Sequence, residues 1–259
     1  MQVIYIASPS HSGSTLLNLM LGAHPEIVAV GELHKLNRRS VSVCGCGASI
    51  WDCEFWSGVS KETLQTLGKS IADLDILNYT EMDEAHSPNA VAFRAISQVS
   101  GKRYVVDSSK RPGRLSYLTQ LESLDVFPIH LTRNPKGQIC SAIRQNGGFA
   151  EHIYNYVVIH ERIRRVLKSV PHRVVHYEDL VLDPKRTLNT ILEPLGLKFH
   201  RRQLAWETQL HHMIAGNKLQ WQPSGLILDE RWKYNLSHFQ QFAISLGTAY
   251  SRRRLGSSV

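Results

Sequence analysis

Short apolar runs rich in β-branched residues alternate along the chain with longer segments in which apolar residues recur at helical spacing. This alternation is typical of βα units, because a strand buried on both faces of a parallel sheet is apolar throughout. The runs predict strands at residues 3–7, 103–106, 126–132 and 173–176. The sequence therefore predicts an α/β fold with three layers, α/β/α, around a central and mostly parallel sheet.

The segments of helical spacing lie between and after these strands. They predict helices at residues 13–23, 114–124, 136–145, 153–170, 185–195 and 238–250. Ser237 and Gln240 have the spacing of a capping box at the start of the last helix. Residues 45–56 and 216–228 are predicted to be irregular loops. Since no long polar linker divides the chain, we expect one domain over residues 1–259, with a C-terminal helical segment at about 229–254.

Composition narrows the class of protein but does not choose a function. The 259 residues are 42% hydrophobic, which is enough for a substantial core. The net charge of +8 favours polyanionic partners such as nucleotides, acidic glycans, membranes or nucleic acids. No nucleic-acid motif or basic stripe interleaved with aromatic residues is present, so we expect no nucleic-acid partner.

The chain carries no pattern of a targeting or membrane segment. Its first apolar run follows no basic segment and is too short for a signal peptide, and no later run approaches the length of a spanning helix. We therefore expect no membrane span and a cytoplasmic location. Four cysteines are too few for a disulfide scaffold at this length.

The first predicted strand leads into a turn that has the chemistry of an anion site. A strand, a tight turn and a helix direct free backbone N–H groups and the positive end of a helix dipole at an anion. The turn consists of Ser10, His11, Ser12, Gly13, Ser14 and Thr15. A P-loop for ATP or GTP would have lysine after the second glycine, but Ser14 follows Gly13 here. The sequence thus predicts a phosphate or sulfate site that is poorly suited to a triphosphate.

A second anion site is predicted where the strand at residues 126–132 ends. Arg133 follows this strand directly, and arginine binds phosphate through two parallel hydrogen bonds. Ser141 lies two turns into the next helix and can reach the same anion. Two different anion sites, each following a strand, fit a nucleotide with two separate phosphate groups better than a triphosphate.

Residues 9–17, with Ala23-His24-Pro25 and Gly31-Glu32 after them, resemble the 5′-phosphosulfate loop of the sulfotransferases that use 3′-phosphoadenosine 5′-phosphosulfate (PAPS). In that family an arginine or lysine usually occupies the position of His11. Histidine can donate a hydrogen bond there and carries charge only when protonated. The resemblance implies a P-loop-like fold, PAPS as the donor and adenosine 3′,5′-bisphosphate (PAP) as the product.

The resemblance also implies roles for residues farther along the chain. Arg133 and Ser141 are similar to the family's pair that binds the 3′-phosphate, and Tyr177 would lie beside the adenosine. Asn217 and Lys218 occupy the place of a late loop that closes over the nucleotide. The matching segments extend to about Leu236.

Sulfuryl transfer needs an in-line approach, a cation near the bridging oxygen and a base for the acceptor proton, but it demands no metal. Lys110 is our candidate for the cation, because its segment resembles the family motif that contacts the departing oxygen. Glu32 is the first candidate for the base, and His34 is the alternative. His11 and Asp107 are weaker candidates for the base, and Asp107 could instead orient Lys110 or position the acceptor.

We expect the acceptor to be a hydroxyl or an amine on a small molecule, a glycan or a peptide; the sequence does not identify it or the oligomeric state. Two other functions fit the same anion sites. One is a nucleotide kinase or phosphotransferase of the P-loop type, which the missing lysine disfavours. The other is a protein that binds a nucleotide or polyanion without catalysis.

Cys44, Cys46 and Cys53 place three thiols within ten residues. They can remain reduced, form a local disulfide, or bind zinc, which requires a fourth ligand from elsewhere, such as His34. We favour reduced, partly buried thiols and expect no metal ligand. The position of these cysteines after Glu32 suggests that their loop forms one wall of the acceptor pocket.

Overall fold

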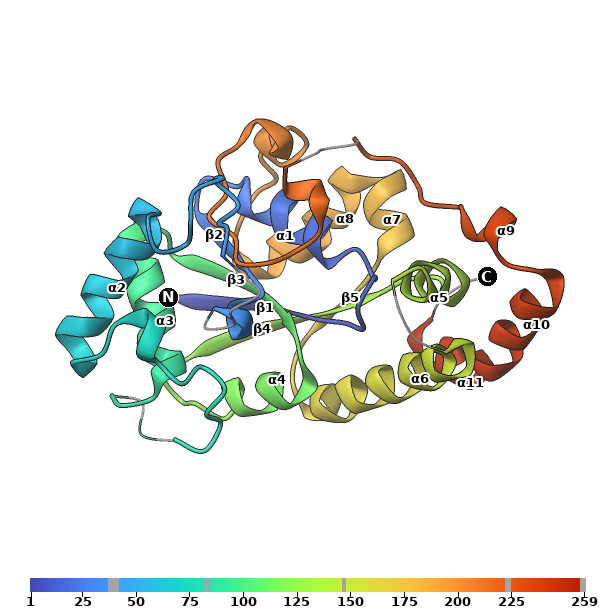
Figure 1. Ribbon diagram of the computed structural model, residues 1–259, viewed down its shortest axis with the longest axis horizontal. Helices are drawn as coiled ribbons and strands as arrows, with labels where there is room; N and C mark the ends of the chain where they lie inside the picture. The colour runs from blue at the N-terminus through green and yellow to red at the C-terminus, as the bar shows by residue number, and fades with distance from the viewer. Residues whose placement is uncertain (37–41, 82, 84, 146–147, 222–224, 257–259) are drawn as a thin grey trace.

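A parallel β-sheet of five strands forms the centre of the molecule (Figure 1). The computed structural model describes residues 1–36, 42–81, 83, 85–145, 148–221 and 225–256. The strands are β1 (Gln2–Ala7), β2 (Ile27–Gly31), β3 (Tyr104–Lys110), β4 (Asp125–Thr132) and β5 (Arg173–His176), in the order β2-β3-β1-β4-β5. Each strand pair in this sheet is parallel. The predicted α/β fold is confirmed.

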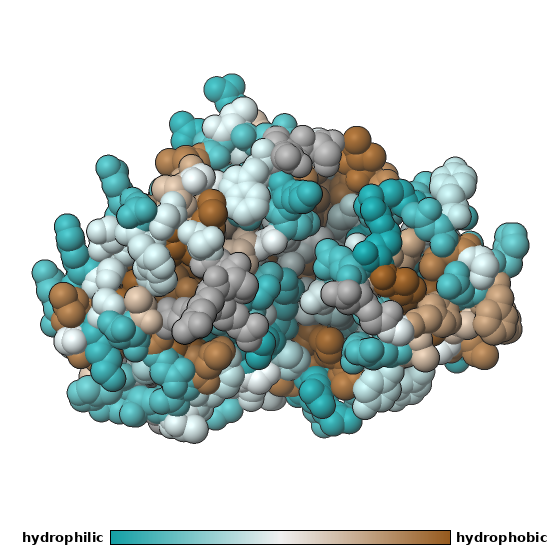
Figure 2. Space-filling view, viewed as in Figure 1, coloured by the Kyte–Doolittle hydropathy of each residue, from teal (hydrophilic) through white to brown (hydrophobic). Residues whose placement is uncertain are grey.

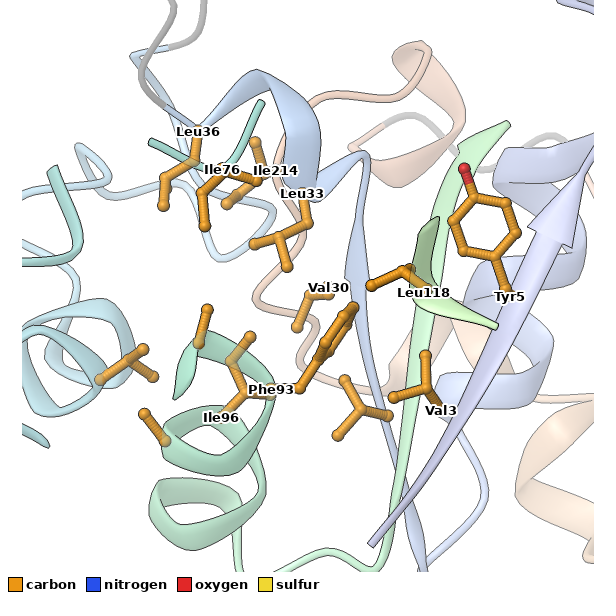
Figure 3. Close-up of a cluster of buried hydrophobic side chains, with 14 of the residues drawn as sticks. Val3, Tyr5, Val30, Leu33, Leu36, Ile76, Phe93, Ile96, Leu118 and Ile214 are labelled. Carbon is orange, nitrogen blue, oxygen red and sulfur yellow. The ribbon is translucent and has the colours of Figure 1, made fainter. Parts of the chain in front are cut away.

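The central strand β1 is buried on both faces, as its uninterrupted apolar run predicts. Val3 and Tyr5 point into one core cluster, which also contains Val30, Leu33 and Phe93 (Figure 3). Ile4 and Ile6, which alternate with them, point into a second cluster on the opposite face. The sheet is therefore the middle layer of three.

Helices cover both faces of the sheet (Figure 1). One face carries α1 (Ser14–Gly22), α7 (Tyr177–Leu182) and α8 (Pro184–Leu192), and the other carries α2 (Glu54–Leu67), α3 (Pro88–Ser100), α4 (Pro112–Leu118) and α6 (Phe149–Val166). At one end of the molecule, α5 (Pro135–Ile143), α9 (Trp232–Asn235) and α10 (His238–Gly247) pack with α6 around a third, smaller cluster, and α11 (Ala249–Leu255) packs against α6 and α10. Ser237 and Gln240 form the predicted capping box at the start of α10.

Several elements differ from the sequence prediction. The strand β2 and the helices α2 and α3 were not predicted, and the expected loop at residues 45–56 is wrong at its end because α2 begins at Glu54. The strand β3 continues past its apolar residues to Lys110, since its polar end still pairs with β1. The predicted helix at 114–124 ends at Leu118, and Ala249 starts a separate helix after α10. Within the expected loop at 216–228, residues 222–224 lie outside the described part.

Two features of the molecule bear on contacts with membranes and with other molecules: the length of its helices and the distribution of apolar side chains on its surface. Among the described helices, none combines the length and apolar character needed to cross a lipid bilayer. Brown, apolar side chains gather at the end of the molecule that contains α10 (Figure 2), where Phe239, Phe242 and Leu246 are exposed. Elsewhere on this view, charged and polar side chains are mixed with small apolar areas.

Candidate active site

The predicted site residues come together at the carboxyl edge of the sheet. Because all five strands run in the same direction, their last residues lie along this edge, and the turns that follow them face one another. The loop after β1, the Lys110 end of β3 and the Arg133 end of β4 meet here because β1 pairs with both β3 and β4. The fold thus explains why residues more than one hundred positions apart can form one site.

The turn after β1 leaves the first turn of α1 open to an anion. No side chain of the described residues caps this helix, so its first backbone N–H groups are available. Gly13 has φ of 89°, and a Cβ there would lie 2.4 Å from Cδ2 of Tyr177. Only glycine meets both conditions without strain. The hydroxyl of Ser12 is buried and has no hydrogen-bond partner among the described residues, which suits it to an oxygen of a bound phosphate or sulfate.

The backbone is strained at three points around this turn. The described non-glycine residues with positive φ are His11 at 66°, Lys110 at 68° and Ala215 at 57°. Such conformations are costly and persist where the surrounding structure enforces them, as often happens at functional sites. His11 lies in the Ser10–Thr15 turn, Lys110 ends β3, and Ala215 precedes Gly216, which lies against Thr15.

Arg133 joins the two predicted anion sites. Its Nη1 donates a hydrogen bond to the carbonyl of His11 at 2.9 Å, and its guanidinium lies 4.4 Å from the centre of the Tyr177 ring. The imidazole Nδ1 of His11 is in turn 3.4 Å from the hydroxyl of Ser141. The pair Arg133 and Ser141 therefore adjoins the Ser10–Thr15 turn directly.

An acidic residue that the sequence analysis did not assign holds Arg133 in place. The Asp229 carboxylate lies 3.1 Å from Nη2 of Arg133 and also binds the exposed Arg231. Hydrogen bonds from Arg231 lower the pKa of Asp229 well below its usual range. Burial opposes this shift, and Arg133 adds to it. Asp229 therefore remains ionised and orients the guanidinium. Its position after a loop, nearly one hundred residues from Arg133, gives no signal in the sequence.

Lys110 and Glu32 form an ion pair next to the turn. The Nζ of Lys110 is 2.7 Å from Oε1 of Glu32, and the Nζ of Lys35 is 2.8 Å from Oε2. Burial lowers the pKa of Lys110, while the Glu32 carboxylate opposes this change. Burial would raise the pKa of Glu32, but the two ammonium groups outweigh it, and the net shift is downward. The Glu32 carboxylate is therefore ionised at neutral pH, and it opposes the loss of charge on Lys110.

A protein-family comparison gives the decisive match: the model described as "Sulfotransferase family" matches residues 3–201, which contain the Ser10–Thr15 turn, Lys110 and Arg133. The chain belongs to the PAPS-dependent sulfotransferase family. Its reaction is sulfuryl transfer, and the kinase alternative is not favoured. A search of curated protein sequences found no significant match.

Solved sulfotransferase structures share this fold. The sulfotransferase domain of the Synechococcus PCC 7002 olefin synthase has a TM-score of 0.68 at 21% identity, covering 100% of this chain and 95% of that domain. The sulfotransferase domain of the curacin biosynthetic pathway has a TM-score of 0.59 at 19% identity, covering 96% and 97%. A sulfotransferase from Mycobacterium tuberculosis H37Rv has a TM-score of 0.51 at 15% identity, covering 82% and 72%.

The histidines of this sulfotransferase are neutral in the site. Burial, with Lys110 and Arg133 nearby, lowers the pKa of His11, so this residue does not replace the cation that the family usually has at its position. His34 is buried, and burial together with Arg111 lowers its pKa to about 3. Its Nδ1 has no hydrogen-bond partner among the described residues. Since His11 is neutral, Lys110 and Arg133 are the cations that lie beside the turn.

Asp107 holds the end of β3 in place. It is not positioned to contact the acceptor, which was another role considered from the sequence. Its carboxylate is fully buried and accepts hydrogen bonds from Nε of Arg114 at 2.9 Å and from the backbone N–H of Ser109 at 2.8 Å. These bonds hold the polar end of β3, so Asp107 orients the segment that carries Lys110. An acceptor proton cannot reach it without breaking the Arg114 pair.

The late loop that begins at Gly216 lies near the Ser10–Thr15 turn. Asn217 and Lys218, the two residues predicted to contact the nucleotide, are exposed to solvent. A Cβ on Gly216 would be 3.4 Å from Cγ2 of Thr15, which places this segment against the start of α1. Asn217 caps the short helix η7 (Lys218–Gln220), which also packs against α1. The side chain of Lys218 is exposed.

A pocket opens beside the turn, on the side of α5 and α6. Its volume is about 300 Å³, and polar and apolar side chains line it together. The lining includes Ser10, His11, Gln138, Ile139, His152 and Tyr156. Ser10 and His11 thus have one side toward this pocket, which offers room for an acceptor next to the anion site.

Proposed function

We propose that this sulfotransferase binds PAPS across the two anion sites and transfers its sulfuryl group to a hydroxyl or an amine. The Ser10–Thr15 turn would hold the 5′-phosphosulfate, and Arg133 with Ser141 would hold the 3′-phosphate. The hydrogen bond from Arg133 to the carbonyl of His11 carries this proposal, because it fixes the two sites as parts of one surface. PAP would be the product.

The remaining donor contacts follow from the same surface. Ser12, Ser14 and Thr15 add hydroxyl donors to the free N–H groups of α1. The Tyr177 ring lies between Gly13 and Arg133, where it can contact the nucleoside. Lys218 would add a phosphate contact from the loop beside α1. These roles assign the hydroxyl groups of Ser12, Ser14 and Thr15 to the donor, while Ser10 and His11 also face the pocket beside the turn.

Lys110 would stabilise the departing phosphate oxygen. As the bond from sulfur to the bridging oxygen breaks, negative charge grows on PAP, and a buried ammonium stabilises that charge more than solvent does. The leaving PAP oxygen is a weak base, so this step does not call for a metal ion. The acceptor would approach in line from the pocket beside Ser10 and His11.

Glu32 is our candidate for the base. In the free enzyme both of its oxygens bind lysines, and Lys110 occupies Oε1. When PAPS draws the Lys110 ammonium toward the bridging oxygen, Oε1 becomes free to accept the acceptor proton. The lowered pKa of Glu32 keeps this carboxylate in its proton-accepting form at neutral pH.

The Glu32→Gln variant is expected to lower kcat by about 10², the usual contribution of a general base. In the wild-type enzyme, the lowered pKa of Glu32 means that acid inactivation of kcat/KM, which reports on the free enzyme, begins only below the usual titration range of a glutamate. Steady-state rates with PAPS over this range measure both effects. Lys35→Ala, which removes the other partner of the carboxylate, is the control and should leave kcat nearly unchanged. If His34→Gln abolishes activity and Glu32→Gln does not, His34 is the base instead.

Calorimetric titration with PAP and with ADP tests the proposed donor site. PAP should bind at least about tenfold more tightly, because ADP lacks the 3′-phosphate that Arg133 would bind. A screen with labelled PAPS against hydroxyl and amine acceptors would then define the acceptor class. Equal affinity for the two nucleotides would contradict the assignment of the 3′-phosphate site.

A further inference from the structure

A cluster of three cysteines and one histidine lies outside the donor site. Cys44, Cys46, Cys53 and His212 each offer one ligand atom, and these four atoms all lie within 4.8 Å of one another. We propose that these residues bind a structural zinc ion. This inference concerns a different site from the sulfuryl transfer and does not depend on it.

The distances between the ligand atoms match the edges of a zinc tetrahedron. Bond lengths of about 2.3 Å to sulfur and about 2.0 Å to nitrogen give edges of about 3.8 Å between sulfurs and about 3.6 Å between sulfur and nitrogen. The Sγ atoms of Cys46 and Cys53 are 3.7 Å apart. The Nδ1 of His212 is 3.8 Å from Sγ of Cys44 and 3.2 Å from Sγ of Cys53. An ion fits between these atoms with little movement.

The backbone around the first two cysteines forms a tight turn that directs both sulfurs to one point. Cys44 accepts at its carbonyl from the N–H of Gly47 at 2.9 Å, and its own N–H donates to Ala48 at 2.8 Å. Gly47 has φ of 92°, a conformation that glycine permits. Cys53 caps the start of α2, so its sulfur approaches from another direction.

His212 arrives from a segment far along the chain. The N–H of Gly45 donates to the carbonyl of Met213 at 3.0 Å, which holds this segment beside the cysteine turn. The ring of Phe55 stacks on the His212 ring with centroids 4.9 Å apart. The imidazole is therefore oriented by packing toward the three sulfurs. The fourth ligand considered from the sequence, His34, does not belong to this group.

The composition and burial of the cluster favour a structural ion over a disulfide. A disulfide bond between Cys46 and Cys53 would leave the fully buried Cys44 thiol and the His212 imidazole close together with no ion for them to bind. Three thiolates and one imidazole are instead a complete ligand set for Zn²⁺, with no position left for water or substrate. Zinc binding releases the thiol protons and gains from ligands that are already close together.

A zinc ion here would connect two segments that frame the active site. Downstream of His212, Ile214 exchanges backbone hydrogen bonds of 2.8 Å with Val30 and with Glu32. The same segment continues to Gly216, which lies against Thr15. The ion would thus hold the late loop against the end of β2 without contacting PAPS.

Elemental analysis of the protein tests this site directly. We expect about one zinc ion per chain after purification without a histidine tag and without chelator. Cys53→Ser and His212→Ala should reduce the content to near zero. Cys140→Ser is the matched control, because Cys140 is buried in the separate cluster around α5, and this variant should retain the ion. Substitution of cobalt for zinc should give the visible absorption of a tetrahedral cobalt thiolate site.

Thiol titration of the wild-type protein keeps the test decisive if the variants do not fold. The cysteines of the cluster should react with a thiol reagent only after a strong chelator removes the ion. The number of reactive thiols should rise in proportion to the zinc released. A native protein that holds no zinc after dialysis against zinc salt would overturn the proposal. So would an intact mass that shows a disulfide, or full zinc content in folded Cys53→Ser and His212→Ala proteins.

Discussion

Replacement of Lys110 by methionine is expected to lower kcat by about 10²–10³, the loss seen when one preorganised donor to a developing charge is removed. Lys110, whose side chain is 16% exposed, is a cation beside the Ser10–Thr15 turn, and His11 there is neutral. Methionine keeps the length and much of the packing of the side chain but removes the charge. The affinity for PAP should change much less than kcat, because the charge on the bridging oxygen develops mainly during transfer.

Lys35→Met is the matched control for this experiment. Lys35 binds the same Glu32 carboxylate, at 2.8 Å, but its side chain is 31% exposed, so water can replace it. We expect its kcat to stay close to that of the wild type. Steady-state rates together with PAP titrations separate the two effects. Equal losses in the two lysine variants would show that the charge state of Glu32, rather than the Lys110 ammonium, determines the rate.

The Arg133→Ala variant is expected to lose about 10²-fold in affinity for PAP and little in affinity for ADP. A buried arginine that forms charge-assisted hydrogen bonds to a phosphate contributes several times more than an exposed one. Only the nucleotide with a 3′-phosphate can lose this contribution. Calorimetric titration of both nucleotides, with thermal unfolding to verify the fold, measures the difference.

Arg231→Ala serves as the control for Arg133. Both arginines bind the Asp229 carboxylate, but Arg231 is 59% exposed and lies on the outer side of that pair. Its removal should leave the ratio of PAP to ADP affinity nearly unchanged. A uniform loss for both nucleotides in Arg133→Ala would indicate that Arg133 only supports the backbone of His11.

Much of the candidate donor site could be predicted from the sequence because local patterns encode it. The apolar run of β1, the glycine of the turn and the buried helix α1 are consecutive, so their geometry follows from short-range preferences. A parallel sheet then places the residues that follow β1 and β4 at one edge. Arg133 therefore lies next to the turn without any further signal.

The parts that could not be predicted depend on contacts between distant segments. Asp229 approaches Arg133, and Arg114 takes the carboxylate of Asp107, only in the folded chain. His212 meets the cysteines more than 150 residues after them, so spacing alone indicated three ligands at most. The strand β2 is a five-residue segment, too short for periodicity to separate it from a turn.

A crystal structure of the protein with PAP tests the central claim most directly, which is that one surface binds both phosphate groups of the donor. We predict the 5′-phosphate on the backbone N–H groups of the Ser10–Thr15 turn, near Lys110. The 3′-phosphate should lie within hydrogen-bond distance of Arg133 and Ser141. A 3′-phosphate that points into solvent, or a nucleotide bound away from the turn, would contradict the account.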